Sequence, residues 1–379
     1  MINNHSKIEK LIAELCTNGV EFKELGKIMK RSKGTKITAA QMKEIHQDNA
    51  PVKIFAGGKT FAMVNFDDIP KKDIHNIPSI IVKSRGIIEF EFCDKPFSHK
   101  NEFWSYFSED KNIDTKYIFY YLKTKEVYFQ RIASKMQMPQ ISLLDTEKFQ
   151  IPIPPLAVQE EIVKILDSFT ELEAELEAEL EARKRQYEYY RSELVLSNEG
   201  FEPVSLSNIA TIGTGSHDTK DAVVDGEYMF YARGRVPLRL NSYDFDENAI
   251  ITAGDGVGVG KVFHFARGKY ALHQRAYRIV PNENVVPRFI YHYLVADFAR
   301  YLERTSVHAS VTSLRRPMFL NYLVSLPPFN EQQRIVSILD KFDALVNDIL
   351  VGLPAELNGR RKQYEYYRDK LLTFKELKK

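Results

Sequence analysis

The chain of 379 residues contains the same hexapeptide, QYEYYR, twice, at 186–191 and again at 363–368. Each copy ends a longer match, in which IPIPPLAVQEEIVKILDSF at 151–169 corresponds to VSLPPFNEQQRIVSILDKF at 324–342. The longer match has an offset of 173 residues and the hexapeptide an offset of 177, so the second copy has four extra residues in between. This period is far longer than that of solenoid repeats, and it indicates a duplicated unit made of a globular part and a helix.

The repeated element is predicted to be a long helix. Pro154 and Pro155 end the preceding strand, and apolar residues then recur at steps of three and four along one face. The run ELEAELEAELEAR adds strong helix formers without Gly or Pro, so we expect a rod over about 158–196. At about 1.5 Å per residue the rod would span roughly 50–60 Å, and its narrow apolar stripe requires a partner helix.

The second copy of the element is the expected partner. Its apolar positions repeat those of the first copy, but Gly352 and Pro354 in VGLPAELNG predict a break or a kink. We expect the two helices to pair antiparallel, with a globular part at each end of the pair. The N-terminal helix, which carries Ile8, Leu11 and Ile12, is expected to pack near the C-terminal helix.

Composition limits the class of protein. No apolar run approaches the roughly 20 residues that a membrane span needs. The N-terminal segment lacks the hydrophobic core of a signal peptide, and the net charge is only +2. Cys16 and Cys93 lie far apart and outside any paired motif, which disfavours a disulfide framework and a zinc site. We therefore expect a cytoplasmic protein without a bound metal.

Each globular part is predicted to mix strands and helices. SIIVKSRGIIEFEF at 79–92 indicates two strands around a turn, and AIITAGDGVGVGKVFHF at 249–265 is its counterpart. Each is followed by a polar and aromatic stretch, HKNEFWSY in the first half and LHQRAYRI in the second. The plan is shared while the loops differ, as two recognition specificities on one scaffold would require.

Several loops are rich in the donors that clamp phosphates and read base edges. They include KRSKGTK at 30–36, YARGRVPLR at 231–239 and SVHASVTSLRR at 306–316. The bland interpretation of any single residue among them is a solvated surface cation. The candidate DNA-binding residues are Lys30, Arg31, Lys33, Thr35, Lys36, Lys83 and Arg85 in the first half, and Arg233, Arg235, His273, Arg275, Arg315 and Arg316 in the second.

No catalytic motif stands out. SLPPF at 325–329 is only superficially similar to the box of amino-methyltransferases, because Leu326 replaces the polar residue that must hold the target amine. GDGVGVGK at 254–261 has the wrong glycine spacing for a nucleotide-binding loop and is interpreted as a tight turn. No His, Cys or Glu grouping has metal-ligand spacing. The sequence thus predicts neither a catalytic residue nor a cofactor.

The chain resembles the specificity subunits of type I restriction-modification systems in three motifs. These are the duplicated Pro-Pro-hydrophobic-x-x-Gln-x-x-Ile pattern ending in Leu-Asp, the two RKQYEYYR-like tails, and the L-x-x-I segments at 25–28 and 206–209. The resemblance covers the full length. It implies an α+β fold with two mixed α/β target recognition domains, held apart by two long antiparallel helices in a pseudo-two-fold duplication. The expected bounds are 1–156 for the first domain with its N-terminal helix, 157–197 for the first helix, 198–329 for the second domain and 330–379 for the second helix, kinked near 351–355.

The resemblance also implies a function. Each domain would read one half of a bipartite double-stranded DNA target, and the helices would dock two methyltransferase subunits and, in the full complex, restriction subunits. The chain itself would be non-catalytic. The residues expected at the docking surfaces are Gln159, Ile162, Ile165, Tyr187, Tyr189, Tyr190, Arg191, Gln332, Ile335, Ile338, Tyr364, Tyr366, Tyr367 and Arg368.

Two other classes of protein stay open at this point. One is a stand-alone DNA methyltransferase or nuclease with unrecognised motifs. The other is a coiled-coil adaptor without DNA binding, which would explain the helices but not two elaborate domains with divergent loops.

Overall fold

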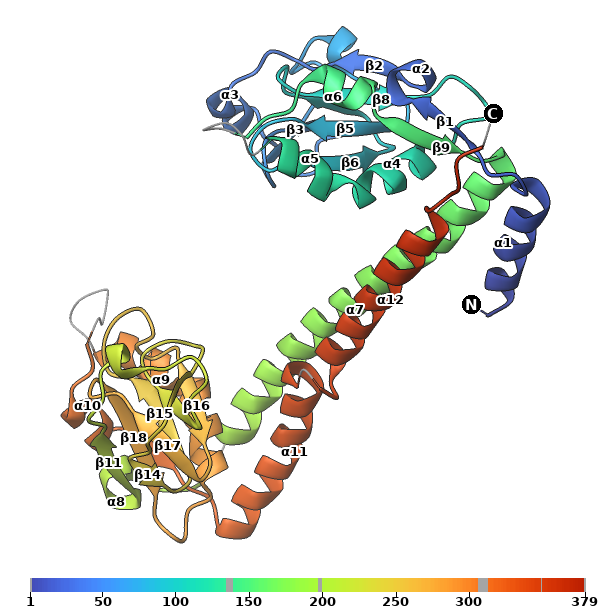
Figure 1. Cartoon of the computed structure of the whole chain (residues 1–379). Coiled ribbons are helices and arrows are strands. Elements are labelled where there is room, and N and C mark those ends of the chain that lie inside the picture. The colour runs from blue at the N-terminus through green and yellow to red at the C-terminus, as the bar shows by residue number, and fades with distance from the viewer. Residues whose placement is uncertain (1, 134–138, 197–199, 306–312, 349, 378–379) are drawn as a thin grey trace. The chain divides into compact units, whose positions relative to one another are not determined.

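The computed structural model describes residues 2–133, 139–196, 200–305, 313–348 and 350–377. Two compact units emerge: Met1–Glu175 with Asn358–Lys379, and Leu176–Leu357 (Figure 1). The loop 306–312, which belongs to a stretch that we expected to contact DNA, lies outside the described residues.

The first unit is built on an antiparallel sheet in the order β2-β8-β5-β6, made of Lys30–Lys33, Trp104–Phe107, Ser79–Lys83 and Glu89–Cys93. A smaller sheet in the order β4-β3-β7 is made of Phe61–Val64, Val52–Phe55 and Phe97–His99. Its β3-β7 pair is parallel, because the chain crosses from one sheet to the other between these strands.

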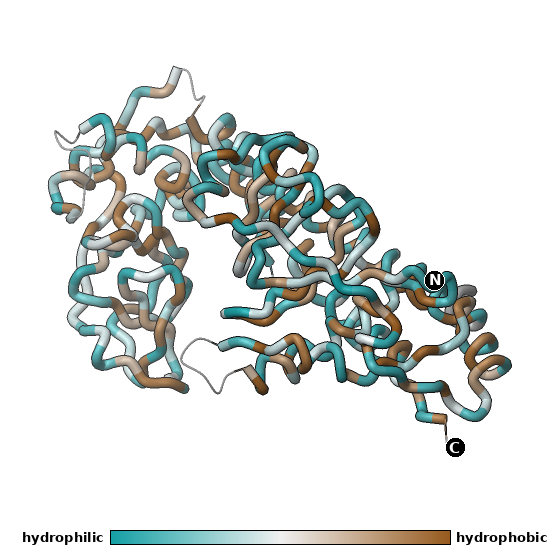
Figure 2. The backbone as a smooth tube through the Cα atoms, turned by 90° about the horizontal axis from the view of Figure 1, so that it is seen from above, coloured by the Kyte–Doolittle hydropathy of each residue, from teal (hydrophilic) through white to brown (hydrophobic). Residues whose placement is uncertain are grey.

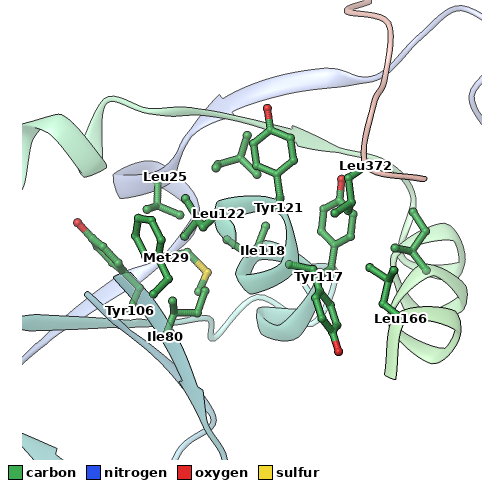
Figure 3. Packing of buried hydrophobic residues seen from close by; sticks show 14 of the residues in the cluster. Leu25, Met29, Ile80, Tyr106, Tyr117, Ile118, Tyr121, Leu122, Leu166 and Leu372 are labelled. Carbon is green, nitrogen blue, oxygen red and sulfur yellow. The ribbon is translucent and has the colours of Figure 1, made fainter. Parts of the chain in front are cut away.

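Helices and a two-stranded ribbon complete the first unit. The ribbon pairs β1 (Glu21–Glu24) with β9 (Gln150–Ile153). The helices are α1 (Ile2–Leu15), α2 (Leu25–Ile28), α3 (Ala39–Glu44), α4 (Thr115–Thr124), α5 (Glu126–Ala133), α6 (Leu143–Glu147) and the 3₁₀ turn η1 (Lys71–Asp73). Figure 3 shows the core, where Ile80 and Tyr106 from the main sheet meet Tyr117 and Ile118 from α4 and Leu166 from the long helix.

The second unit repeats this topology. Its main sheet has the order β11-β18-β15-β16, made of Ala210–Thr214, Ala276–Pro281, Ala249–Ala253 and Phe263–Ala266. The smaller sheet, β13-β12-β17-β14, is made of Leu238–Leu240, Tyr228–Tyr231, Lys269–Leu272 and Phe245–Asp246, and its β12-β17 pair is again parallel. The ribbon pairs β10 (Pro203–Ser205) with β19 (Leu323–Ser325). The predicted duplication of a mixed helix-and-sheet domain is therefore confirmed.

The helices of the second unit differ at one place. They are α8 (Leu206–Ile209), the 3₁₀ turn η2 (Thr219–Asp221), α9 (Pro287–Thr305) and α10 (Arg316–Leu320). The single α9 corresponds to the broken pair α4 and α5 of the first unit, in which Lys125 ends α4.

The helices that carry the duplicated sequence are α7 (Leu156–Leu196), α11 (Phe329–Asn347) and α12 (Leu353–Leu371). In the first unit α7 packs antiparallel against α12: the rings of Phe169 and Tyr367 lie 5.6 Å apart, and Glu173 pairs with Arg361 at 2.6 Å. In the second unit α7 packs against α11, where Tyr187 stacks on Phe342 at 6.3 Å. The long helix thus contributes to both units.

The helical path of the second copy stops at Asn347 and restarts at Leu353. Gly352 lies in this break because an alanine Cβ there would come within 2.5 Å of the Ala344 carbonyl oxygen. Pro354 lies in the first turn of α12, where its missing amide would have had no intrahelical partner. The proline therefore starts the second segment rather than bending a continuous helix.

The two ends of the chain meet within the first unit. Ile8 of α1 is fully buried in the same cluster as Leu371 and Leu372, and Glu9 pairs with Lys370 at 3.2 Å. Val20 forms a parallel bridge with Glu376. The expected packing of the N-terminal helix near the C-terminal helix is confirmed. Along the tube in Figure 2, apolar and polar stretches alternate, and no helix of the described residues is long and apolar enough to cross a membrane.

Candidate nucleic-acid interface

A polar hollow of about 350 Å³ lies in the first unit at the end of β2, beside the turn that leads into β8. Its lining residues are Arg31, Ser32, Lys33, Gly34, Asn101, Glu102, Phe103 and Trp104. The turn is closed by the amide of Phe103, which donates to the Lys100 carbonyl at 3.0 Å. Cations, an amide, a carboxylate and an aromatic edge therefore share one concave surface.

The second unit has a hollow of about 340 Å³ at the equivalent place. Its lining residues are Thr214, Gly254, Asp255, Gln274, Arg275, Tyr277, Ser313 and Leu314. The registers of the sheets make the two sites equivalent: Lys33 pairs with Trp104 in the first unit, and Thr214 pairs with Tyr277 in the second. The amide of Ala276 donates to the His273 carbonyl at 3.0 Å, as that of Phe103 does to Lys100.

A glycine fixes the geometry of each hollow. Gly34 and Gly215 follow β2 and β11, and at both positions the backbone of the neighbouring strand approaches too closely for a side chain. An added Cβ would lie 2.0 Å from the His99 carbonyl oxygen in the first unit and 1.9 Å from that of Leu272 in the second. The main chain is therefore the same at the two sites, while the side chains around it differ.

The charges of the second hollow are organised by one carboxylate. Asp255 accepts hydrogen bonds from Arg233 at 2.8 Å and from Arg275 at 3.1 Å. Burial raises the pKa of Asp255, but the hydrogen bonds and the positive charges of Arg233 and Arg275 outweigh that effect, so its pKa is lowered. The aspartate stays ionised and orients both guanidinium groups, which still carry donors that Asp255 does not use.

In the first hollow the carboxylate is that of Glu102, on the turn between β7 and β8, whereas Asp255 of the second hollow lies on the turn after β15. Glu102 pairs with Lys100 at 2.6 Å. Burial raises the pKa of Glu102, but hydrogen bonding by Lys100 and its own backbone, and the positive charges of Lys100 and Arg85, outweigh burial and lower that pKa. Lys30, at the start of β2, forms an ion pair with Glu109.

Most of the predicted DNA-binding side chains are accessible. Those that are exposed are Lys30, Arg31, Lys33, Lys36, Arg85, Arg235, Arg275, Arg315 and Arg316, and Arg233 is half-buried. Arg31 and Lys33 line the first hollow and Arg275 lines the second, where Arg233 reaches Asp255. Arg315 and Arg316 follow directly after the lining residue Leu314.

Three predicted residues are buried and are not available to DNA. Lys83 is 1% exposed, since its ammonium group contacts Glu91 and the Gly58 carbonyl inside the first unit. Thr35 is buried where its amide donates to the His99 carbonyl at 2.8 Å. His273 is buried below Arg275, whose amide donates to the His273 Nδ1 atom at 2.9 Å.

Sequence reasoning missed the uncharged and acidic members of the two hollows, because the candidates were chosen mainly for positive charge. Asn101, Trp104, Gln274 and Tyr277 line the hollows beside the cations. Their signal was the matching pair of stretches HKNEFWSY and LHQRAYRI, which place an amide and an aromatic residue at corresponding positions.

Several residues predicted at docking surfaces are part of the core. The buried ones are Gln159, Ile162, Ile165, Tyr187, Gln332 and Ile335. Gln159 accepts from the Asp114 amide at 2.9 Å and donates to the carbonyls of Asn112 and Pro154. Gln332 accepts from the Val286 amide at 2.8 Å and donates to the Pro327 carbonyl. The repeated glutamine therefore connects the start of each helix copy, α7 or α11, to the globular part that precedes it.

Within QYEYYR the residues divide by exposure. Tyr189 and Tyr366 are 61% and 63% exposed, and Tyr190 is 40% exposed. Arg191 lies over the ring of Tyr187, and Arg368 lies over Tyr364 and pairs with Asp369 at 2.9 Å. Ile338, Tyr364 and Tyr367 are half-buried. The most exposed tyrosine is thus the same one in each copy, Tyr189 in the first and Tyr366 in the second.

The Leu-Asp ending of the repeat also has a structural role. Asp167 accepts from Lys116 at 2.8 Å and from the hydroxyl of Tyr120. Asp340 accepts from Arg288 at 2.9 Å, and His292 Nε2 lies 3.2 Å from it. Partial burial raises the pKa of Asp340, but the hydrogen bonds to His292 and Arg288 outweigh burial and lower that pKa to about 2.

Over the ranges that the structure describes, no group of three or more His, Cys, Asp or Glu side chains could hold a metal ion. The structure does contain two equivalent polar hollows, each lined in part by positively charged side chains, on a duplicated scaffold. These features define a protein with two similar recognition domains, each joined to a copy of the same helix.

The model of the type I restriction-modification DNA specificity domain matches this chain twice, over residues 17–182 and 198–359. The chain therefore belongs to that family, as a specificity subunit with two target recognition domains. It is 30% identical to the specificity subunit of the type I restriction enzyme EcoR124I/EcoR124II from Escherichia coli, with 97% of each chain covered. It is 26% identical to the specificity subunit of the type I restriction enzyme MpnII from Mycoplasma pneumoniae, over 62% of this chain and 92% of that one.

Solved structures show the same fold. The S subunit of a type I restriction-modification system from M. genitalium superposes with a TM-score of 0.63 at 15% identity, covering 93% of this chain and 96% of that one. A chain from a study of complex assembly in the type I restriction-modification system gives a TM-score of 0.61 at 14% identity, covering 93% and 97%.

Proposed function

We propose that each target recognition domain reads one half of a bipartite double-stranded DNA sequence through its polar hollow. The observation that carries the proposal is the equivalence of the two hollows: one backbone frame, closed by the same hydrogen bonds, presents different side chains in each half. A shared frame docks both domains in the same way, whereas different side chains select different bases.

The exposed cations around the first hollow are the proposed phosphate contacts. Arg31 and Lys33 alternate along β2, so they share one face of the strand, and both line the hollow, while Lys30 and Lys36 are exposed cations before and after them. Each phosphate contact releases counterions from DNA, which makes binding weaken as salt rises.

The test replaces these four residues together by Ala and measures DNA affinity between low and physiological salt. We expect weaker binding to all sequences, with the salt slope reduced by about 1 for each phosphate that is no longer neutralised. A variant with Ala at Lys71 and Lys72, exposed cations of η1 outside the hollow, is the matched control and should keep the wild-type slope. An unchanged slope in the fourfold variant would refute the interface.

The modular layout predicts how specificity is divided. Replacing residues 198–325 by the matching part of a relative should change one half of the recognised sequence and leave the other half unchanged. A change in both halves together would contradict two independent readers. The domain bounds 1–156, 157–197, 198–329 and 330–379 belong to this proposal.

The second proposed activity is assembly. Two methyltransferase subunits, joined by restriction subunits in the full complex, would dock on the exposed face that the QYEYYR copies share. Tyr189 and Tyr366 are large, exposed and equivalent, and tyrosine is a favoured interface anchor. Methylation would then be performed by the partners, with this non-catalytic chain acting in the cytoplasm.

Replacing Tyr189 and Tyr366 by Ala should weaken co-purification with the methyltransferase and leave the melting temperature within about 1 °C, because surface changes cost little stability. Tyr187→Ala is the contrasting variant, since that ring is buried against Phe342 and its removal should lower the melting temperature. Full association of the double variant would exclude this face as the docking site.

A further inference from the structure

The turn after β5 and the turn after β15 occupy the same place in the two domains. The amide of Ile141 donates to the Ser84 carbonyl at 3.0 Å, and the amide of Leu314 donates to the Gly254 carbonyl at 2.7 Å. One residue further on, Arg85 bridges to Gln140 and Asp255 bridges to Ser313. Arg85 and Asp255 are therefore equivalent positions with opposite charge.

Both turns project the same way beyond these residues. Gly86 and Gly256 follow, with φ of 77° and 80°, in the left-handed region that favours glycine. The next residues are apolar and yet exposed: Ile87 is 60% exposed and Val257 fully so. The two turns therefore share a left-handed glycine and an exposed aliphatic residue after it.

A second pair of equivalent positions, Glu102 and Arg275, also carries opposite charges in the two domains. Ser84 Oγ donates to the Glu102 carbonyl at 2.8 Å, and the Gly254 amide donates to the Arg275 carbonyl at 2.8 Å. Glu102 and Arg275 are therefore equivalent as well. The first domain carries arginine on the β5–β6 turn and glutamate on the β7–β8 turn, whereas the second carries aspartate and arginine in the same two places.

We propose that these two positions form a base-reading pair, and that the two domains read a G·C base pair in opposite strand orientations relative to their own scaffold. The inference rests on the proposed DNA-reading function. Arginine recognises the O6 and N7 atoms of guanine, and a carboxylate accepts a hydrogen bond from the N4 amino group of cytosine. Exchanging the two side chains between equivalent positions exchanges the strands on which guanine and cytosine are read.

Each carboxylate of the two pairs has a second cationic neighbour, Lys100 beside Glu102 and Arg233 beside Asp255, so its charge is balanced locally. The order of donor and acceptor is what a base edge distinguishes, because guanine offers two acceptors and cytosine offers a donor. Glu102 lines the first hollow and Asp255 and Arg275 line the second, and each hollow also presents an amide side chain, Asn101 in one domain and Gln274 in the other. In the second domain Asp255 holds Arg275 at 3.1 Å and so positions it for a planar, bidentate contact.

The test reverses one pair within the full chain. The variant Arg85→Asp/Glu102→Arg keeps the opposite charges but gives the first domain the order of the second. Binding selection from duplexes randomised in both half-sites should show G·C replaced by C·G at one position of the first half-site, with a preference change of about 10-fold. The second half-site should be unchanged. The variant Asp255→Arg/Arg275→Asp should give the mirror result.

A gentler pair of variants covers the case in which a reversed chain does not fold. Arg85→Lys and Arg275→Lys keep the charge but remove the planar fork, so each should lose about 10-fold in guanine preference at its own half-site only. Unaltered preferences in these folded variants, with DNA binding retained, would overturn the inference and leave the proposed function standing. Absence of any sequence selection by the wild-type chain would instead overturn the proposed function.

Discussion

The two hollows and the two helix copies of this molecule differ in opposite ways. The helix copies keep their side chains, such as the buried glutamines Gln159 and Gln332 and the exposed tyrosines Tyr189 and Tyr366. The hollows keep their backbone hydrogen bonds and change their side chains, with Glu102 in one where Arg275 stands in the other. The helix copies share both backbone and side chains, as expected for surfaces that have the same function twice. The hollows share only the backbone, as expected for two sites of different specificity.

The largest effect should come from the glycines that shape the hollows. Gly34→Ala and Gly215→Ala would each drive a Cβ to about 2 Å from a backbone oxygen, so each should destabilise its own unit by about 3 kcal/mol or more. Chemical denaturation followed by hydrogen exchange would assign the destabilisation to one unit. Gly57→Ala, where the added Cβ meets nothing within 4 Å, is the control. Equal stability of all three variants would mean that the hollows do not share this constraint.

The glutamine clamps should rank next. Gln159→Leu or Gln332→Leu would leave buried backbone groups without partners, at a cost of about 2 kcal/mol each. The first should cost more, because Gln159 makes three hydrogen bonds and Gln332 makes two. Urea unfolding midpoints would measure both. The neighbouring, exposed Gln333→Leu should change the stability by less than about 0.5 kcal/mol, and a similar destabilisation there would discount the clamp.

A smaller effect, on the pH dependence of stability, is expected in the second unit. Asp340 has a folded pKa of about 2, below its ordinary value, so its contribution is present at neutral pH and is lost as pH falls towards 2. Because the side chain is 38% exposed, we expect Asp340→Asn to cost only about 1 kcal/mol at pH 7, a gap that closes by pH 2. Unfolding of both proteins across this range would test it, with the exposed Asp225→Asn as control. A gap that widens at low pH would contradict the sign.

The smallest effect concerns the helices. Gly359 of α12 stands where α7 has Ala182, at the offset of 177 residues that aligns the hexapeptides. Gly359→Ala should stabilise the chain by about 0.5–1 kcal/mol, since the added Cβ meets nothing within 4 Å. Ala182→Gly, at an exposed position, should lower stability by a similar amount. Melting curves of the two variants should therefore shift in opposite directions.

Features of the fold could be predicted from the sequence where apolar residues recur at regular spacing. The duplication, the long helix and the packing of Ile8 near Leu371 follow from regular apolar spacing, which a single sequence displays. The burial of Lys83 does not, because it depends on Glu91 in the facing strand and on a carbonyl 25 residues away. The role of Asp255 was equally hidden, since its partners Arg233 and Arg275 come from two other turns. Contacts between loops distant in the chain are set by the fold and leave no local pattern.

The meeting of the two chain ends has an evolutionary consequence. Leu371 and Leu372 enter the first core at the positions that Leu194 and Val195 occupy in the second, 177 residues earlier. Each domain therefore receives the tail of the helix that precedes it in a closed cycle, and the first domain receives it from the last helix. Such an arrangement has no privileged starting point, so a circular permutant opened between the two copies would keep every domain-to-tail pairing. It also fits an origin by duplication of a half-length unit, because the two copies share their sequence pattern and their strand order.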